Sequence, residues 1–77
     1  MPRITPEPWR VLECVFLAAG YAFSRQASSH RVYEREGSVR PVVIPCYDAI
    51  SADIITRLLR TAGMGREEYF RLLSGCR

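Results

Sequence analysis

His30 is the only histidine in the chain, and it is the residue best suited to acid–base chemistry. An imidazole titrates near neutral pH, so it can accept or donate a proton in a reaction at a phosphate. Arg31 follows it directly, and Ser28 and Ser29 precede it. Because a guanidinium group binds phosphate through two parallel hydrogen bonds, this stretch predicts proton transfer beside a bound phosphate.

Two strand-like runs hold these residues. Apolar side chains alternate with small or polar ones over residues 21–26, and a second run covers residues 30–36. The small residues 27–29 between the runs predict a tight turn. His30 therefore begins a strand, so a rigid element positions its side chain.

Three arginines are candidates for holding the phosphate. Side chains alternate between the two faces of a strand, which places Arg31 on the face opposite His30. Arg25 and Arg40, on the neighbouring strands, therefore compete with Arg31 for this role. A pair of histidines acting as acid and base is excluded, since the chain has only one.

The N-terminal part of the chain predicts a helix. Thr5 suits the N-cap, Pro6 the first helical position and Gly20 the C-cap. Cys14 lies within this helix, where its simplest role is that of a small packing residue. Apolar residues recur there at helical spacing, which indicates a face packed on a core: Trp9, Leu12, Val15, Phe16 and Ala19.

The second half of the chain predicts one more strand and two helices. Residues 39–44 form the strand, and Pro41 within it indicates an edge strand or a later start. Ser51 caps a helix that Gly63 ends. Residues 65–73 form a short last helix.

The order of these elements predicts one α+β domain over residues 1–77, with a three-stranded antiparallel sheet and helices packed on one face. A chain of 77 residues buries roughly 60% of its unfolded surface, so the core is small. No apolar run approaches the roughly 20 residues that span a bilayer. The N-terminal residues also lack the pattern of a signal peptide.

Cys14, Cys46 and Cys76 show neither a disulfide framework nor the short paired spacing of a metal site. The expectation is therefore three free thiols in a reducing cytoplasm, with no metal and no other cofactor. The net charge is +3 and all 11 basic residues are arginine. This balance permits binding to nucleic acid without requiring it.

An Arg-Gln-x-x-Ser-His element enters the second strand, and Val-Val-Ile-Pro ends the third. Leu-Leu-Arg-Thr-Ala-Gly-Met, followed by Glu-Glu-Tyr-Phe, stands in the helical part after them. In these motifs and in its order of elements, from Thr5 to about Leu73, the chain resembles the HicA toxins, small ribonucleases of bacterial and archaeal toxin–antitoxin systems. The resemblance implies the α-β-β-β-α fold of double-stranded-RNA-binding domains, here with one additional helix.

The resemblance also implies an activity and a partner. The family cleaves mRNA through the histidine of a Gly-Ser-His element, which Ser29 and His30 match and Ser28 alters. Where family members often carry a basic residue and a histidine after the third strand, this chain has Cys46 and Tyr47. The expected partners are mRNA and a HicB-like antitoxin in the cytoplasm, with no membrane and no DNA bound directly. His30 is the predicted catalytic residue, and the predicted RNA contacts are Arg25, Ser28, Ser29, Arg31 and Arg40.

Two other functions fit the same residues. A binding module could hold structured RNA through its basic face without cutting it, and its affinity would fall with salt but not depend on His30. A decayed toxin, retained for its antitoxin, would bind that partner and leave RNA intact. Tyr47 could stack on a base, and the simpler interpretation is a tyrosine packed at a loop edge.

Overall fold

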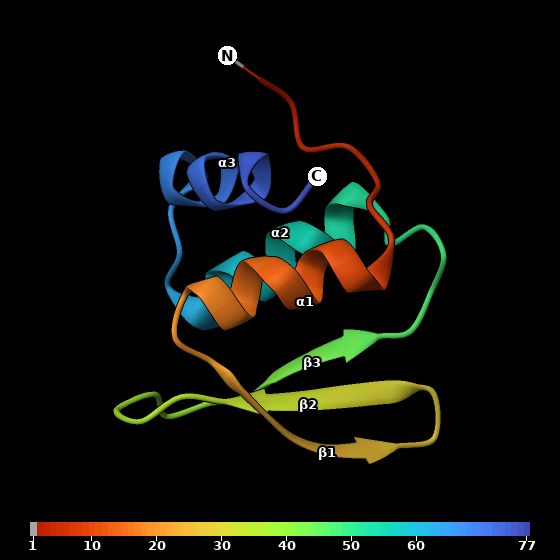
Figure 1. The fold of residues 1–77 in the computed structure, drawn as a ribbon, viewed down its shortest axis with the longest axis vertical. Coiled ribbons are helices and arrows are strands. Elements are labelled where there is room, and N and C mark those ends of the chain that lie inside the picture. Colours follow the sequence, from red (N-terminus) through yellow and green to blue (C-terminus); the bar gives the residue numbers. More distant parts are fainter. Residues whose placement is uncertain (1) are drawn as a thin grey trace.

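The computed structural model describes residues 2–77 and shows an α+β fold with three helices and a three-stranded antiparallel sheet (Figure 1). The predicted order of elements is confirmed. None of the helices in residues 2–77 has the length and apolar character that crossing a bilayer requires. In chain order the elements are α1 (Trp9–Ala18), β1 (Ala22–Ala27), β2 (His30–Glu34), β3 (Val42–Pro45), α2 (Ala52–Ala62) and α3 (Arg66–Ser74).

The sheet is a meander in which β2 lies between β1 and β3. His30 pairs with Ala27 of β1 and with Pro45 of β3, so the β1–β2 turn and the end of β3 lie at the same end of the sheet. The register of β1 shifts between Phe23 and Arg25, which leaves Ser24 as the extra residue of a β-bulge.

α1 begins later than predicted, so Thr5 and Pro6 lie outside the helix. The reason is Pro8, because a proline disfavours helical backbone at the residue before it. That residue, Glu7, is instead paired with Ile50. The Glu7 N–H donates to the Ile50 carbonyl at 3.2 Å, and the Ile50 N–H donates back at 2.7 Å. Pro8 itself occupies the N-cap position with an extended backbone.

Apart from the start of β2, the strand ends also differ from the prediction: most by one residue, and more at the end of β2 and the start of β3. β2 stops at Glu34, and the chain then turns through Gly37, whose φ of 86° suits glycine. β3 begins at Val42, directly after Pro41, because proline lacks the N–H that strand pairing uses. The later start indicated by Pro41 is therefore confirmed, and residues 39–41 belong to the loop.

α2 matches the prediction at both ends. Ser51 is its N-cap, and the Ser51 hydroxyl oxygen accepts a hydrogen bond from the Ile54 N–H at 3.4 Å. Gly63 ends the helix in a left-handed conformation with φ 67°. α3 is displaced by one residue from its predicted range, a difference that is ordinary for helix ends.

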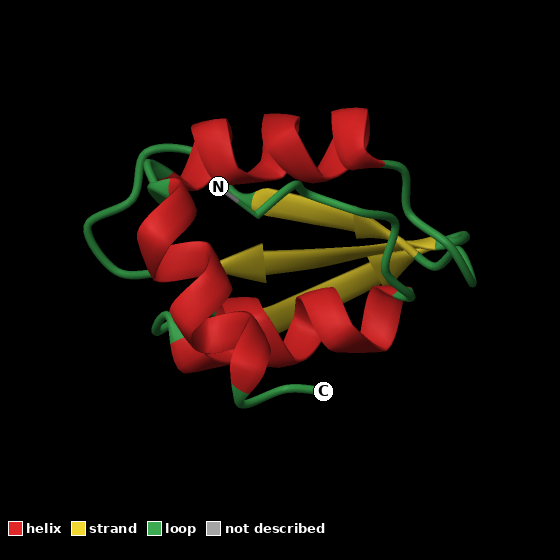
Figure 2. Ribbon diagram, turned by 90° about the horizontal axis from the view of Figure 1, so that it is seen from above, coloured by secondary structure: helices red, strands yellow, loops and turns green. Residues whose placement is uncertain are grey.

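The core lies between the helices and one face of the sheet. Figures 1 and 2 show α1 and α2 over the same face, with α3 farther from the strands. This agrees with the predicted packing of helices on one face, and within residues 2–77 the other face carries no helix. The buried apolar cluster contains Leu12, Val15, Phe16, Tyr21, Tyr33, Val42, Ile44, Ile50, Ile55, Leu58, Leu59, Met64, Tyr69 and Leu73.

Arg35 connects the C-terminal ends of two helices. Its Nη1 donates to the Ala19 carbonyl at 3.1 Å, and its Nη2 donates to the Ala62 carbonyl at 3.3 Å. The same guanidinium group lies 4.5 Å from the centre of the Tyr21 ring. Since the last carbonyls of a helix lack internal partners and carry partial negative charge, these contacts stabilise both α1 and α2.

Cys14 and Cys76 form a disulfide, with 5.8 Å between their Cα atoms. The prediction of three free thiols is therefore wrong for this pair, and only Cys46 is free. Spacing could not reveal the bond, because 62 residues separate the partners and the packing of α3 on α1 brings them together. An ion pair between Arg77 and Glu7 holds the same C-terminal tail.

Reduction of the disulfide should lower the free energy of unfolding by about 4 kcal/mol, because the cross-link restricts the unfolded chain over a long loop. Guanidinium chloride denaturation with and without dithiothreitol measures the difference. Cys76→Ser should reproduce the loss, whereas Cys46→Ser should change the stability by less than about 0.5 kcal/mol. Equal midpoints for the oxidised and reduced protein would contradict the cross-link.

Candidate functional site

The β1–β2 turn consists of Ser28 and Ser29. Ser28 has φ 58°, and it is the only non-glycine residue with positive φ in residues 2–77. A left-handed backbone at the first position of a two-residue hairpin turn is typical of glycine. Ser28 therefore holds a backbone conformation that glycine adopts more readily.

His30 follows the turn as the first residue of β2. Its side chain is exposed, and it forms no hydrogen bond with any side chain in residues 2–77. Alternation along β2 places it with Val32 and Glu34 on the face that the helices leave uncovered. The predicted position at the start of a strand is confirmed.

Arg25 is the predicted phosphate ligand that shares this face with His30. It pairs with Val32 and is therefore diagonal to His30, a relation that corresponds to about 7–8 Å between positions. The Arg25 guanidinium lies 3.7 Å from the Glu34 carboxylate, and both side chains are more than half exposed. An exposed ion pair of this kind is weak, so a phosphate can replace the carboxylate as the partner of Arg25.

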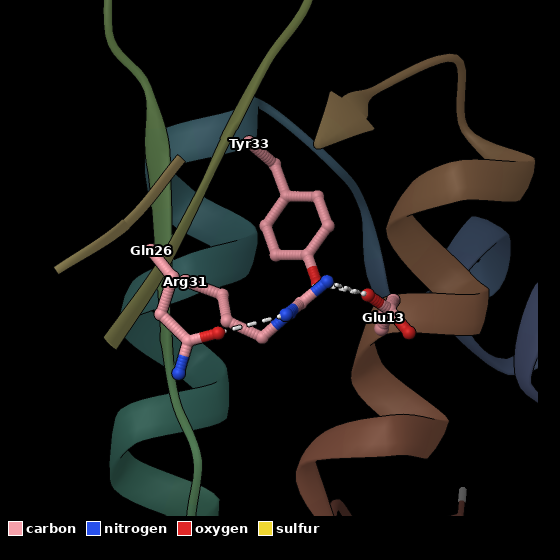
Figure 3. Close-up of polar contacts among 4 residues, drawn as sticks. All are labelled: Glu13, Gln26, Arg31 and Tyr33. Carbon is pink, nitrogen blue, oxygen red and sulfur yellow. Dashed lines mark hydrogen bonds and ion pairs between the residues drawn. The ribbon is translucent and has the colours of Figure 1, made fainter. Parts of the chain in front are cut away.

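Arg31 points to the helix side of the sheet, as the alternation predicted, and the structure does not bring it to His30. Figure 3 shows its guanidinium group directed toward Glu13 of α1. Arg31 Nη2 donates to the Glu13 carboxylate at 3.1 Å, and Nε donates to the Tyr33 hydroxyl at 3.0 Å. Nη1 donates to the Gln26 amide oxygen at 3.0 Å. The Tyr33 hydroxyl in turn donates to Glu13.

The pKa values of Tyr33 and Arg31 are both raised within this cluster. Burial, and then the hydrogen bond to the Glu13 carboxylate, raise the pKa of Tyr33 to about 12. The hydrogen bond with the Tyr33 hydroxyl, together with the nearby Glu13 carboxylate, raises the pKa of the Arg31 guanidinium above its ordinary value. Tyr33 therefore stays protonated and Arg31 stays charged across the physiological range.

Arg40 lies at the other end of the sheet from His30. It precedes β3, whereas His30 pairs with Pro45 at the end of that strand. The length of β3, about 10 Å, separates the two positions. Arg40 instead lines a cavity of about 220 Å³ together with Glu34 and Ser38.

The residues that follow β3 lie beside the β1–β2 turn. The Cys46 N–H donates to the Ser29 carbonyl at 2.8 Å, which extends the strand pairing beyond β3. Tyr47 is 45% exposed, so it lies at the surface of the loop with part of the residue covered, and the interpretation of a tyrosine at a loop edge stays open beside that of a stacking residue. Its backbone is held, because the Trp9 N–H donates to the Tyr47 carbonyl at 3.0 Å. The Tyr47 ring is thus available for stacking.

The uncovered face therefore offers one imidazole, one guanidinium and the hydroxyl groups of a tight turn. These groups can move one proton and bind one phosphate. Within residues 2–77, no three His, Cys, Asp or Glu side chains come together as metal ligands. Comparison with known proteins finds no matching family model, no matching curated protein and no matching solved structure.

Sequence reasoning missed two features of this region. The first is Glu13, which is the partner of Arg31. Its position could have indicated this role, because Glu13 is a charged residue between the apolar residues Trp9 and Leu17 on one side of the helix. The bulge at Ser24 also changes which way the first part of β1 faces. Nothing in the residue types of that run predicts a bulge.

Ser28→Gly should raise the free energy of unfolding by about 1 kcal/mol, because glycine adopts positive φ without the steric cost that serine carries. Chemical denaturation of the variant and the parent measures the gain. Ser29→Gly is the matched control, and it should bring no gain since Ser29 has no positive φ. A lower stability for Ser28→Gly would show that the strain is absent.

The stability of the protein should fall as the pH rises from about 10 to about 12. Burial raises the pKa of Tyr33 and of Tyr69 to about 12, against an ordinary value of 10.0. In this range the unfolded chain releases protons that the folded chain retains, so each added pH unit favours unfolding. Urea denaturation across the range measures the slope. Tyr33→Phe and Tyr69→Phe should each reduce it, and an unchanged slope in both variants would refute the assignment.

Proposed function

We propose that this chain is an endoribonuclease that cleaves mRNA, with His30 moving the proton and Arg25 binding the phosphate at the cut. The observation that carries the proposal is the diagonal placement of these two side chains on the uncovered face of the sheet. Both side chains are exposed, so a polynucleotide can reach them without any rearrangement of the fold. The resemblance to the HicA toxins points to the same histidine.

The proposed cleavage needs no metal. His30 takes the proton of a ribose 2′-hydroxyl, and the 2′ oxygen attacks the adjacent phosphorus while the bond to the 5′ oxygen of the next nucleotide breaks. Arg25 stabilises the charge that develops on the phosphate oxygens, and Ser28 and Ser29 supply polar contacts beside it. Since the chain has one histidine, water supplies the proton for the leaving oxygen. The products are a 2′,3′-cyclic phosphate and a 5′-hydroxyl end.

The proposed fold is that of double-stranded-RNA-binding domains, with α3 as an addition. Its support is the order α1-β1-β2-β3-α2 with both helices over one face of the sheet. The positive φ of Ser28 supports the match of this turn to a Gly-Ser-His element. The proposed role is that of a toxin restrained by a HicB-like antitoxin, with mRNA as its target in the cytoplasm.

The disulfide sets a condition on this proposal. Cytosolic thioredoxin and glutathione keep thiols reduced, and a disulfide between Cys14 and Cys76 is typical of an oxidising environment. A toxin acting in the cytoplasm must therefore keep its fold when this pair is reduced. The denaturation measurement with and without dithiothreitol determines whether enough stability remains.

One observation favours a second candidate function, an RNA-binding module without cleavage. No side chain in residues 2–77 orients the imidazole of His30, whereas catalytic bases are ordinarily held by a third group. The basic residues of such a module would bind the phosphate backbone, with an affinity that falls as salt is added.

His30→Ala should lower the rate of mRNA cleavage about 100-fold or more, the usual contribution of a general acid or base. Cleavage by the purified proteins, read by primer extension and by the 2′,3′-cyclic phosphate at the new end, measures the effect. The fold should not change, because the His30 side chain is exposed. Arg57→Ala, at an exposed position on α2, is the control and should cleave at the parental rate.

Equal cleavage by the parent and His30→Ala would remove His30 from the mechanism. Salt-dependent RNA binding without cleavage by either protein would favour the binding module. Tight binding to an acidic antitoxin, with neither cleavage nor RNA binding, would indicate a toxin that has lost its activity.

A further inference from the structure

Phe23 presents an aromatic ring to solvent on the helix side of the sheet. The bulge pairs Phe23 with Tyr33, and the two ring centres are 5.9 Å apart. Tyr33 is fully buried, whereas Phe23 is 46% exposed. β1 is an edge strand and all six of its residues are exposed, so within residues 2–77 no further element covers this ring.

Arg31 lies against this ring and is held rigidly. Its guanidinium carbon is 4.1 Å from the centre of the Phe23 ring and 5.2 Å from that of Trp9. Three hydrogen bonds, to Glu13, Gln26 and Tyr33, fix its orientation. A planar cation therefore covers part of Phe23, while 46% of the residue stays exposed, and a ligand that stacks on the exposed part meets a preorganised surface.

The charge around this surface suits an anion. Glu13 neutralises Arg31, so the available positive charge comes from Arg10. Arg10 is exposed, lies 5.2 Å from the Trp9 ring centre and forms no ion pair with the residues of the described chain. An exposed guanidinium beside an aromatic ring, with a second, exposed ring held through Arg31, is a combination that single-stranded nucleic acids bind, with phosphate on the cation and a base on a ring.

We propose that Trp9, Arg10, Phe23 and Arg31 form a stacking platform for one unpaired base of single-stranded RNA. The proposal rests on the proposed function, because it assigns the substrate class of the same ribonuclease. Phe23 receives the base on its exposed surface, and Arg10 binds an adjoining phosphate. Every base has a flat π face, so the platform accepts any base and its contribution is affinity and register on the strand.

The platform and His30 lie on different sides of the sheet, joined by the edge strand. Arg31 and His30 are consecutive on β2, and their side chains point to opposite faces. No strand lies beyond β1 in residues 2–77, so a flexible single strand can bend around this edge. RNA held on Phe23 is thereby positioned to reach the uncovered face, which a rigid duplex cannot do. The platform therefore selects unpaired RNA.

The test measures binding of a single-stranded RNA oligonucleotide to the His30→Ala variant, which is used so that the RNA is not cleaved. The comparison ligand is a ribose–phosphate oligomer of equal length that carries no bases. Trp9 is the only tryptophan, so quenching of its fluorescence reports a base on the platform, and fluorescence anisotropy of labelled RNA gives the affinity independently. We expect the base-free oligomer to bind about tenfold or more weakly and to cause no quenching. Phe23→Leu should weaken RNA binding by about the same factor, and Phe23→Tyr should restore it.

Leu17→Ala is the matched control, because Leu17 is an apolar residue with the same 46% exposure but no ring. It should leave RNA affinity unchanged, and circular dichroism confirms that each variant is folded. RNA affinity that is the same with and without bases, and the same for the parent residue and Phe23→Leu, would overturn the platform. Absence of RNA binding, together with binding of a protein partner at this surface, would also overturn it.

The measurements distinguish failure of the platform proposal from failure of the ribonuclease proposal. Cleavage that depends on His30 but shows no effect of Phe23→Leu on affinity would refute only the platform. Base-dependent binding through Phe23, with no cleavage by the parent protein, would refute only the ribonuclease. A parent protein that neither binds nor cleaves RNA would refute both.

Discussion

The buried hydroxyl group of Tyr33 is the constraint on which the arrangement of this protein depends. Tyr33 lies on the central strand with no exposed surface, and an unpaired hydroxyl there would cost about 1–3 kcal/mol. Its partners come from two elements, Glu13 on α1 and Arg31 on β2 itself. These bonds fix α1 over the sheet and turn Arg31 away from the uncovered face. The division of the molecule into a helix side and a face with His30 follows from this contact and the alternation of β2.

The number of arginines in the sequence is larger than the number of guanidinium groups that a ligand can reach. Arg35 is committed to the C-terminal ends of α1 and α2, and Arg31 is committed to Glu13 and Tyr33. Both residues add to the net charge of +3, but both stabilise the fold. Arg10 on α1 and Arg25 on β1 remain exposed at the surface. A guanidinium group in a small domain can therefore act as a packing residue, and its neighbours decide which role it has.

Local chemistry explains which parts of the fold the sequence predicts. Ser51 and Gly63 act within one turn of the helix they bound, so α2 could be predicted at both ends. The small residues of the β1–β2 turn likewise placed His30 at the start of a strand. The later start of α1 follows from Pro8 and is also local. The bulge in β1 depends on pairing across the sheet, and the Cys14–Cys76 bond depends on the packing of α3. The bulge and the disulfide come from contacts distant in sequence, which periodicity and spacing do not encode.

The Cys14–Cys76 bond encloses both sheet loops and the α2–α3 connection within one covalent ring. A protease that cuts once inside this ring, for instance in the exposed stretch around Val39, opens the backbone without releasing a fragment. The two pieces stay joined through the disulfide, and β2 and β3, which lie on either side of the cut, remain paired with each other. The nicked molecule keeps its mass until the disulfide is reduced. A single proteolytic cut inside the ring therefore releases a fragment only after the disulfide is also reduced.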